Sequence, residues 1–169
     1  MKYLQLDGDN IRIKDEYLYV GEFHKSIDYE CKNLIEHNGK TNYAIVEKYN
    51  INDFSKPVEI YSIPEQIQGF CIKDDGTIIL SSSWSINSSK LYVYNPESVI
   101  KTRQSYNNSQ VFFLDEPTKT IKAPAMSEDL DIIVSKSGKS KVITMFESSS
   151  NKYFYGKFFF ANYIAALDI

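Results

Sequence analysis

The 169-residue sequence contains only 2 cysteines and 2 histidines, the residues that most often form cross-links or bind transition metals. Glycine and proline are also few, at 7 and 5 residues. The cysteines, Cys31 and Cys71, cannot make a disulfide framework, and they lack the C-x-x-C spacing of a zinc or redox site. We therefore expect two free thiols. Cys71 lies in an apolar stretch, which predicts that it belongs to the core.

Long apolar runs and a surplus of one charge are also missing. No segment approaches the ~20 apolar residues of a membrane-spanning helix, so no membrane span is expected. Residues 1–9 turn acidic before a signal-type apolar segment forms, which predicts a cytoplasmic chain for the sequence as written. Lys and Arg number 19 against 22 Asp and Glu, a net charge of −3. Without a basic field, nucleic acid is not expected as a partner.

Aromatic residues are plentiful instead, with 13 Tyr and 10 Phe. Because no amphipathic helical pattern is sustained over three turns, the sequence predicts a mainly β fold. The clearest signal is the turn Asp74-Asp75-Gly76 between strands over 69–73 and 77–83, since Asp-Gly supplies the positive φ of a tight turn. Further strands are predicted over 90–94 and 118–122.

Two polar segments are predicted to lie outside strands. Residues 95–110 are rich in Asn and Ser, which is typical of a loop. A short helix is predicted over 29–37, within the longest polar stretch in the first part of the chain. Glu22 and His24 are two residues apart, so their side chains lie on the same face of an extended strand. Such a pair fits half of a metal site or an acid–base pair, but His24 is most simply a residue at the edge of a loop. His37, before Asn38-Gly39, is assigned to a turn.

The strand pattern recurs along the chain. The segment around Gln68–Lys73 aligns with Asp9–Lys14 and with a stretch that begins at Glu128, and turn residues follow each copy at a similar distance. Four antiparallel strands repeated at a regular period are typical of propeller blades. We therefore predict three four-stranded antiparallel blades over about 9–63, 64–124 and 125–169. A β-sandwich with coincidental self-similarity is the alternative interpretation.

Several segments also resemble a known family. Ile63–Phe70, Ile79–Trp84 and Ser89–Tyr94 follow the pattern IP..QG…ILS.S…S.L.VY, while Ala123–Asp129 and Phe146–Tyr153 follow P.MSE…FES…KY. With these motifs the chain resembles the C-terminal half of a bacterial family of six-bladed β-propellers. That family is usually exported, and it brings no activity that can be assigned. The resemblance implies half of a six-bladed propeller.

Three blades do not close a ring, because propellers have about four to eight. The uncovered blade faces would expose Phe and Tyr side chains to water. Two copies that pair around a twofold axis would complete six blades, which predicts a homodimer. A missing N-terminal half, supplied as a separate chain, is the other candidate partner.

The first strand of each blade lines the channel of a propeller. By the repeat alignment, Asp9, Gln68 and Glu128 begin these strands, so we expect their oxygen atoms to converge on a polar axial pocket. Such a set is suited to a ligand or to a divalent cation such as calcium, although polar residues also occur wherever a channel is wet. The ends of the second strands add a further set of candidate ligand-binding residues: Glu22, Glu147, Ser81 and Ser82.

Two functions from different classes fit this pattern. The first is a non-catalytic ligand-binding or interaction module. The second is a cation-dependent hydrolase of the lactonase or esterase type, in which Asp9, Gln68 and Glu128 hold a cation that activates water. The sequence contains no G-x-S-x-G nucleophile motif and no phosphate-binding glycine motif. Histidine is scarce and no paired carboxylates stand at a defined spacing, so we predict the binding module and assign no catalytic residue.

Overall fold

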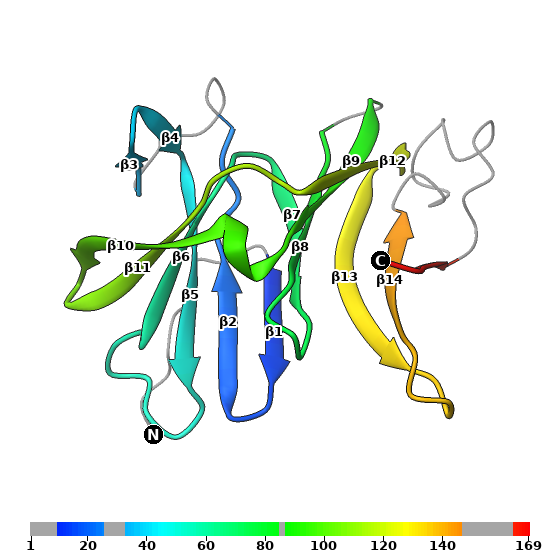
Figure 1. The fold of residues 1–169 in the computed structure, drawn as a ribbon, viewed down its shortest axis with the longest axis horizontal. Helices are drawn as coiled ribbons and strands as arrows, with labels where there is room; N and C mark the ends of the chain where they lie inside the picture. The colour runs from blue at the N-terminus through cyan, green and yellow to red at the C-terminus, as the bar shows by residue number, and fades with distance from the viewer. Residues whose placement is uncertain (1–9, 26–32, 85–86, 147–163) are drawn as a thin grey trace. The chain divides into compact units, whose positions relative to one another are not determined.

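The computed structural model describes residues 10–25, 33–84, 87–146 and 164–169. Within these ranges the protein is all-β, as predicted: strands are joined by turns and by one short 3₁₀ helix, η1 (Pro96–Ser98), and there is no α-helix (Figure 1). The chain divides into two compact units, unit 1 with residues 1–67 and 97–117, and unit 2 with residues 68–96 and 118–169.

Unit 1 contains a six-stranded sheet with the order β1-β2-β5-β6-β11-β10. Its strands are β1 (Asn10–Lys14), β2 (Tyr17–Gly21), β5 (Ala44–Asn50), β6 (Glu59–Ile63), β10 (Val99–Tyr106) and β11 (Ser109–Leu114). All neighbouring pairs are antiparallel except β6 and β11, which run parallel with Ile60 opposite Val111. A separate hairpin, β3 (Ile35–His37) and β4 (Lys40–Asn42), lies between β2 and β5 in the sequence.

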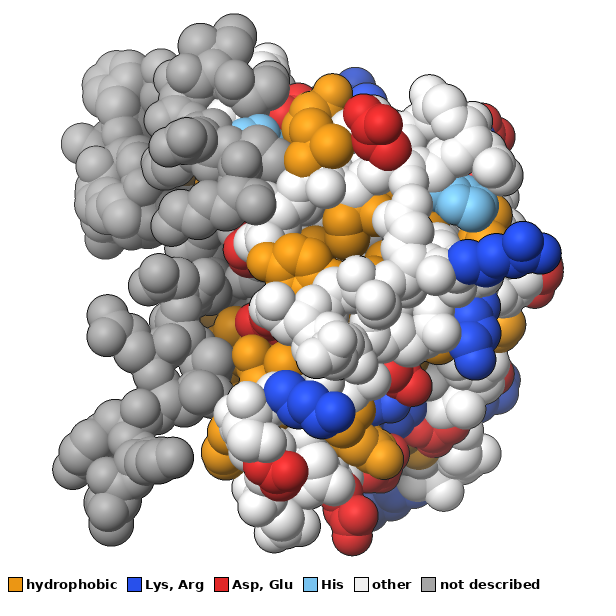
Figure 2. Space-filling view, turned by 90° about the vertical axis from the view of Figure 1, so that its left-hand side faces the viewer, with side chains coloured by type: hydrophobic (Ala, Val, Ile, Leu, Met, Phe, Trp, Pro, Cys, Tyr) orange, Lys and Arg blue, Asp and Glu red, His pale blue; other side chains and the backbone are white. Residues whose placement is uncertain are grey.

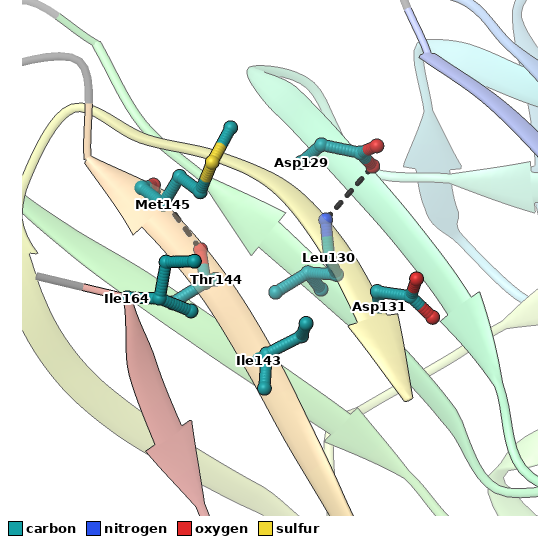
Figure 3. A pocket seen from close by; sticks show the side chains of 7 residues that line it. All are labelled: Asp129, Leu130, Asp131, Ile143, Thr144, Met145 and Ile164. Carbon is teal, nitrogen blue, oxygen red and sulfur yellow. Dashed lines mark hydrogen bonds between the residues drawn. The ribbon is translucent and has the colours of Figure 1, made fainter. Parts of the chain in front are cut away.

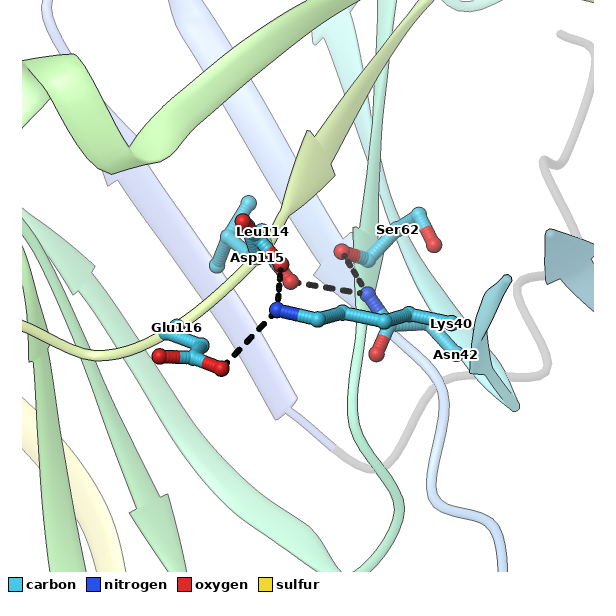
Figure 4. A network of polar contacts seen from close by, with 6 residues as sticks. All are labelled: Lys40, Asn42, Ser62, Leu114, Asp115 and Glu116. Carbon is cyan, nitrogen blue, oxygen red and sulfur yellow. Dashed lines mark hydrogen bonds and ion pairs between the residues drawn. The ribbon is translucent and has the colours of Figure 1, made fainter. Parts of the chain in front are cut away.

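The β3–β4 hairpin packs on the core of unit 1. Ile35 joins an apolar cluster made of Ile45, Ile60, Val111 and Phe113. Asn42 fixes the hairpin to the sheet, because its Nδ2 donates to the carbonyl oxygens of Ser62 at 3.0 Å and Leu114 at 3.1 Å (Figure 4). Ser62 and Leu114 lie at the ends of the parallel strands β6 and β11, so Asn42 bonds to both strands at the same place.

Lysine 40 makes a second link between the hairpin and the sheet. Its Nζ forms ion pairs with Asp115 and, at 2.9 Å, with Glu116 (Figure 4). The hydrogen bonds to Asp115 and Glu116 raise the pKa of Lys40 above its ordinary value. The pair is exposed to solvent, so we assign it a role in positioning the hairpin rather than in stability.

Unit 2 contains two sheets. The four-stranded sheet has the order β7-β8-β9-β12, and the three-stranded sheet has the order β13-β14-β15. The strands are β7 (Ile67–Ile72), β8 (Ile78–Ser82), β9 (Ser88–Tyr94), β12 (Lys119–Ala125), β13 (Ser127–Val134), β14 (Ser140–Phe146) and β15 (Ala165–Leu167). The predicted tight turn connects β7 to β8: Gly76 has a φ of 84° and the Asp75 carboxylate accepts from the amide of Thr77 at 2.9 Å.

Apolar side chains from both sheets form one core in unit 2. Its buried members come from β7, β8, β9, β12, β13 and β14, and they are Cys71, Ile79, Leu91, Val93, Ala123, Leu130, Val142 and Phe146. Cys71 is fully buried in this cluster, which confirms the prediction that it lies in the core. Cys31 lies outside the described residues.

The structure corrects two local predictions. Residues 95–110 are not a loop, because β10 occupies 99–106 and leads into β11 through the turn Asn107-Asn108. Both asparagines have positive φ, 50° and 62°, the backbone of a two-residue hairpin turn. The predicted helix over 29–37 is wrong in its described part, where Ile35–His37 is strand β3. The Asn38-Gly39 turn, with φ of 50° and 78°, directs this segment into a hairpin.

The sheets follow the predicted repeat segments in part. Within 10–63, strands β1, β2, β5 and β6 form four neighbouring strands of the six-stranded sheet, while β3 and β4 form a separate hairpin. The strands from 127 onwards form the three-stranded sheet. The segment 64–124 supplies β7, β8, β9 and β12, but its hairpin β10–β11 joins the sheet of unit 1. An insertion between β9 and β12 therefore adds two strands to a sheet formed by an earlier part of the chain.

Candidate functional site

Strands β7 and β13 approach each other closely at Gly69. A Cβ atom at this position would lie 2.7 Å from the carbonyl oxygen of Glu128 and 2.9 Å from the backbone nitrogen of Leu130. Both distances are shorter than ordinary van der Waals contacts, so only glycine fits here without a shift of the backbone. The close approach brings the starts of these two strands side by side.

Two of the three residues predicted for the axial pocket belong to this junction. Gln68 precedes Gly69 in β7, and Glu128 is the residue whose carbonyl group faces Gly69; both side chains are half-buried. An amide and a carboxylate are thus carried by adjacent strand starts. Asp9, the third predicted residue, lies outside the described residues.

The predicted serines of β8 have different environments. Ser81 is fully buried, and its Oγ lies 2.8 Å from the Oγ of Ser127 and donates to the Ser127 carbonyl oxygen at 3.0 Å. Ser82, the last residue of β8, is half-buried. The hydroxyl group of Ser81 therefore links β8 to β13, while Ser82 stands nearer to solvent.

Ser81 is one member of a buried hydroxyl network. The Oγ of Ser127 is 2.9 Å from Oγ1 of Thr144, and the amide of Ser127 donates to the Oγ of Ser89 at 2.9 Å. All four residues are at most 1% exposed. Because each hydroxyl can donate and accept, the network satisfies polar atoms from β8, β9, β13 and β14 in the interior of unit 2.

Glu22, from the predicted second set, lies in unit 1 just after β2. Its carboxylate accepts from the side-chain amide of Asn33 and, at 3.3 Å, from the amide of Ile45. The hydroxyl of Tyr106 donates to Asn33. Burial, followed by the charges of Glu22 and Glu47, raises the pKa of Tyr106, so this tyrosine stays protonated. Glu147 lies outside the described residues.

The two histidines occupy ring-packing positions. His24 is 4% exposed and stacks on Tyr43, with ring centroids 5.8 Å apart. His37 ends β3 and packs against Phe113 at 5.4 Å. Among the described ranges, His, Cys, Asp and Glu side chains form no group of three or more that is suited to a metal ion.

A surface pocket of about 210 Å³ lies on β13 and β14 in unit 2 (Figure 3). Asp129, Leu130 and Asp131 contribute from β13, while Ile164 precedes β15. The remaining lining residues belong to β14: Ile143, Thr144 and Met145. Strand alternation separates the members, since Leu130 and Thr144 are buried while Asp129, Asp131 and Met145 are exposed.

Charges are mixed on the surface drawn in Figure 2, where acidic and basic side chains lie among one another and among hydrophobic ones. In the part of the chain that the structure describes, no helix has the length and apolar character needed to cross a membrane. Comparison of this chain with protein-family models, with curated proteins and with solved structures finds no match. Its description therefore rests on its own residues.

Proposed function

We propose that this protein is a non-catalytic binding module of the β-propeller kind, with a polar ligand site that includes Gln68 and Glu128. The close approach of β7 and β13 at Gly69 carries this proposal, because two polar residues then stand at the starts of adjacent strands. In a propeller, neighbouring first strands have this relation around the channel. The resemblance of the motifs to a six-bladed family points the same way.

The strand order of unit 2 also supports a blade. The order β7-β8-β9-β12 follows the chain from one edge of the sheet to the other, apart from the inserted β10–β11 hairpin. The β8–β9 and β9–β12 pairs are antiparallel. The antiparallel part of unit 1, β1-β2-β5-β6, has the same sequential order. A meander of four antiparallel strands is the repeating unit of propellers.

The proposed ligand follows from the donor atoms. The Gln68 amide and the Glu128 carboxylate offer oxygen atoms, which hard cations such as Ca²⁺ prefer. The repeat alignment assigns Asp9, which lies outside the described residues, to the same set. Within the described residues, no serine or cysteine lies in hydrogen-bond contact with a histidine that would activate it, so binding rather than covalent catalysis is proposed.

The test is calcium titration by calorimetry of the wild-type protein and two variants. Glu128→Gln keeps the size of the side chain but removes its charge, so we expect Ca²⁺ affinity to fall at least tenfold. Glu36→Gln, at an exposed site in β3, is the matched control and should bind as the wild type does. Heat unfolding of both variants checks that the fold is retained.

Three outcomes of this titration decide the proposal. Loss of affinity in folded Glu128→Gln alone supports the site. Equal Ca²⁺ binding by wild type and Glu128→Gln contradicts it, as does the absence of binding in the wild type. If the calcium-loaded protein also hydrolyses a lactone or an aryl ester, and Glu128→Gln does not, the module is a cation-dependent hydrolase and the non-catalytic assignment is wrong.

A homodimer is the partner that we propose for the module. Two chains related by a twofold axis would bring together the three predicted blades of each and cover their outer sheet faces. A separate chain that supplies a missing half is the competing partner. The mass of the protein in solution distinguishes them, since a homodimer has about 39 kDa, twice the 19.5 kDa of one chain.

A further inference from the structure

The β1–β2 hairpin of unit 1 exposes apolar side chains. Ile11 and Ile13 are 55% and 66% exposed, while Arg12 and Lys14, which alternate with them, are half-buried. An edge strand that faces water normally shows the opposite alternation, with charged residues outward. The reversed pattern indicates that this face of β1 is covered when the protein functions.

Strands β10 and β12, which form two other sheet edges, carry irregularities that β1 lacks. Strand β10 has a register irregularity between Lys101 and Ser105. Strand β12 has one between Ala123 and Ala125, together with exposed Pro124. Bulges and edge prolines hinder pairing with another chain. In contrast, β1 pairs with β2 in unbroken register over all five of its residues.

The β13–β14 hairpin of unit 2 exposes further apolar side chains, on a side that also carries the exposed carboxylates of Asp129 and Asp131. Ile133 is 45% exposed and Met145 is 57% exposed, and both lie on the side of the hairpin that points away from buried Leu130 and Thr144. The pocket shown in Figure 3 lies on the same two strands, so the surface is hollowed rather than flat. A side chain of another molecule can enter it.

The turns of the two hairpins have opposite charges. The β1–β2 turn consists of Asp15 and Glu16, and both are exposed. The β13–β14 turn contains Lys136 and Lys139, which are exposed as well. Each turn directly follows a strand with exposed isoleucine. If the two hairpins pack side by side with their turns at the same end, the isoleucines of β1 contact Ile133 and Met145. The acidic β1–β2 turn then lies beside the basic β13–β14 turn.

We propose that a second copy of this chain covers these surfaces: the β1–β2 hairpin of one copy packs on the exposed side of the β13–β14 hairpin of the other. In the proposed pair, a twofold axis makes this contact twice, so that each copy contributes one surface of each kind. This inference names the interface of the homodimer and rests on that part of the proposed function.

The first test measures mass by light scattering across a wide range of protein concentration. We expect about 39 kDa for the wild type and 19.5 kDa, the mass of one chain, for Ile13→Asp and for Met145→Asp. A charged residue at the centre of an apolar contact should weaken the pair more than a hundredfold. Leu34→Asp, at a 50% exposed position before β3 in unit 1, lies outside both hairpins; it is the control and should remain dimeric.

The second test exchanges the turn charges. Asp15→Asn with Glu16→Lys makes the first turn basic, and Lys136→Glu with Lys139→Glu makes the second turn acidic. Each pair of changes alone should raise the dissociation constant of the dimer at least tenfold, because like charges then face each other. All four changes together should restore it to within about threefold of the wild type.

Clear results would overturn the inference. A wild-type mass of 19.5 kDa at every concentration, or oligomers that keep growing as the concentration rises, contradicts a closed pair. A dimer that survives both Ile13→Asp and Met145→Asp uses another interface, and failure of the fourfold variant to recover excludes the matched turns. Glu128→Gln should dimerise normally. Failure of the calcium site and failure of the interface are therefore observed separately.

Discussion

The two units satisfy polar groups near their cores in different ways. In unit 1, charged and aromatic groups bond to one another. Lys48 forms an ion pair with Glu59 at 2.9 Å, and its Nζ lies 4.2 Å from the ring centre of Tyr17. Glu59 also accepts a hydrogen bond from the hydroxyl of Tyr61 at 2.7 Å. In unit 2, neutral hydroxyl groups around Ser127 form hydrogen bonds with one another, and all of them are fully buried.

This difference predicts different responses to solution conditions. The Lys48–Glu59 pair and the tyrosines beside it depend on ionisation, so pH and salt act on unit 1. Hydroxyl groups do not ionise in the accessible pH range, so the network of unit 2 depends on geometry alone. Unit 2 should therefore be sensitive to changes of size and shape, and unit 1 to changes of charge.

The largest effect is expected in unit 2, from Gly69→Val. The new side chain would overlap the backbone of Glu128 and Leu130, neither of which can move without disturbing β13. We expect a loss of about 3 kcal/mol in the free energy of unfolding, measured with urea. Gly138→Asn is the control, since Asn tolerates the positive φ of that open turn position. Equal stability of Gly69→Val and wild type would contradict the close approach.

A smaller loss is expected when the hydroxyl network is interrupted. Ser127→Ala removes the group that joins Ser81 to Thr144, so stability should fall by about 1 to 2 kcal/mol. Ser137→Ala removes an exposed hydroxyl that is 2.9 Å from Ser135 Oγ and should change stability little. Equal losses of unfolding free energy in Ser127→Ala and Ser137→Ala would show that the buried hydroxyl contributes no more than an exposed one.

The smallest effect is a pH dependence confined to unit 1. Burial, followed by the charges of Glu59 and Asp15, raises the pKa of Tyr19 to about 12. An unfolded tyrosine ionises near pH 10. Between pH 10 and 12 the unfolded chain releases a proton that the folded chain retains, so stability that is present below pH 10 falls as pH rises.

Tyr19→Phe isolates this contribution. Over the same pH window the variant should lose about 1 kcal/mol less stability than the wild type, after allowance for solvent screening. Ser127→Ala should keep the wild-type slope of unfolding free energy against pH, because no ionisable group is changed. Identical slopes for wild type and Tyr19→Phe would show that Tyr19 ionises alike in both states.

Local signals in the sequence predicted the fold where a turn residue fixed the backbone. The Asp75-Gly76 turn and the apolar strands on either side were sufficient to predict β7 and β8 and the burial of Cys71. The pair Asn107-Asn108 carries a comparable hairpin signal, with β-branched Val99, Ile100 and Thr102 before it. Their polar neighbours hid this signal, and the hairpin was predicted as a loop.

Only those residues of the candidate site that recur in the repeat alignment were predicted from the sequence. The repeat alignment placed Gln68 and Glu128 at equivalent positions, but it contained nothing about Gly69, whose role depends on a strand about 60 residues away. Burial of Ser81 was missed for the same reason, since its partner Ser127 lies in another strand. Contacts between distant segments decide whether a polar residue faces a ligand or the interior.

The excursion of the chain through β10 and β11 has a consequence for biosynthesis. Strand β6 meets β11 only after β7, β8 and β9 have been made, so the six-stranded sheet is incomplete until residue 114 has left the ribosome. Unit 1 is therefore completed only after the first part of unit 2 has been translated, and unit 2 only after all of unit 1. A ribosome that stalls near residue 96 would leave the edge of β6 open to aggregation.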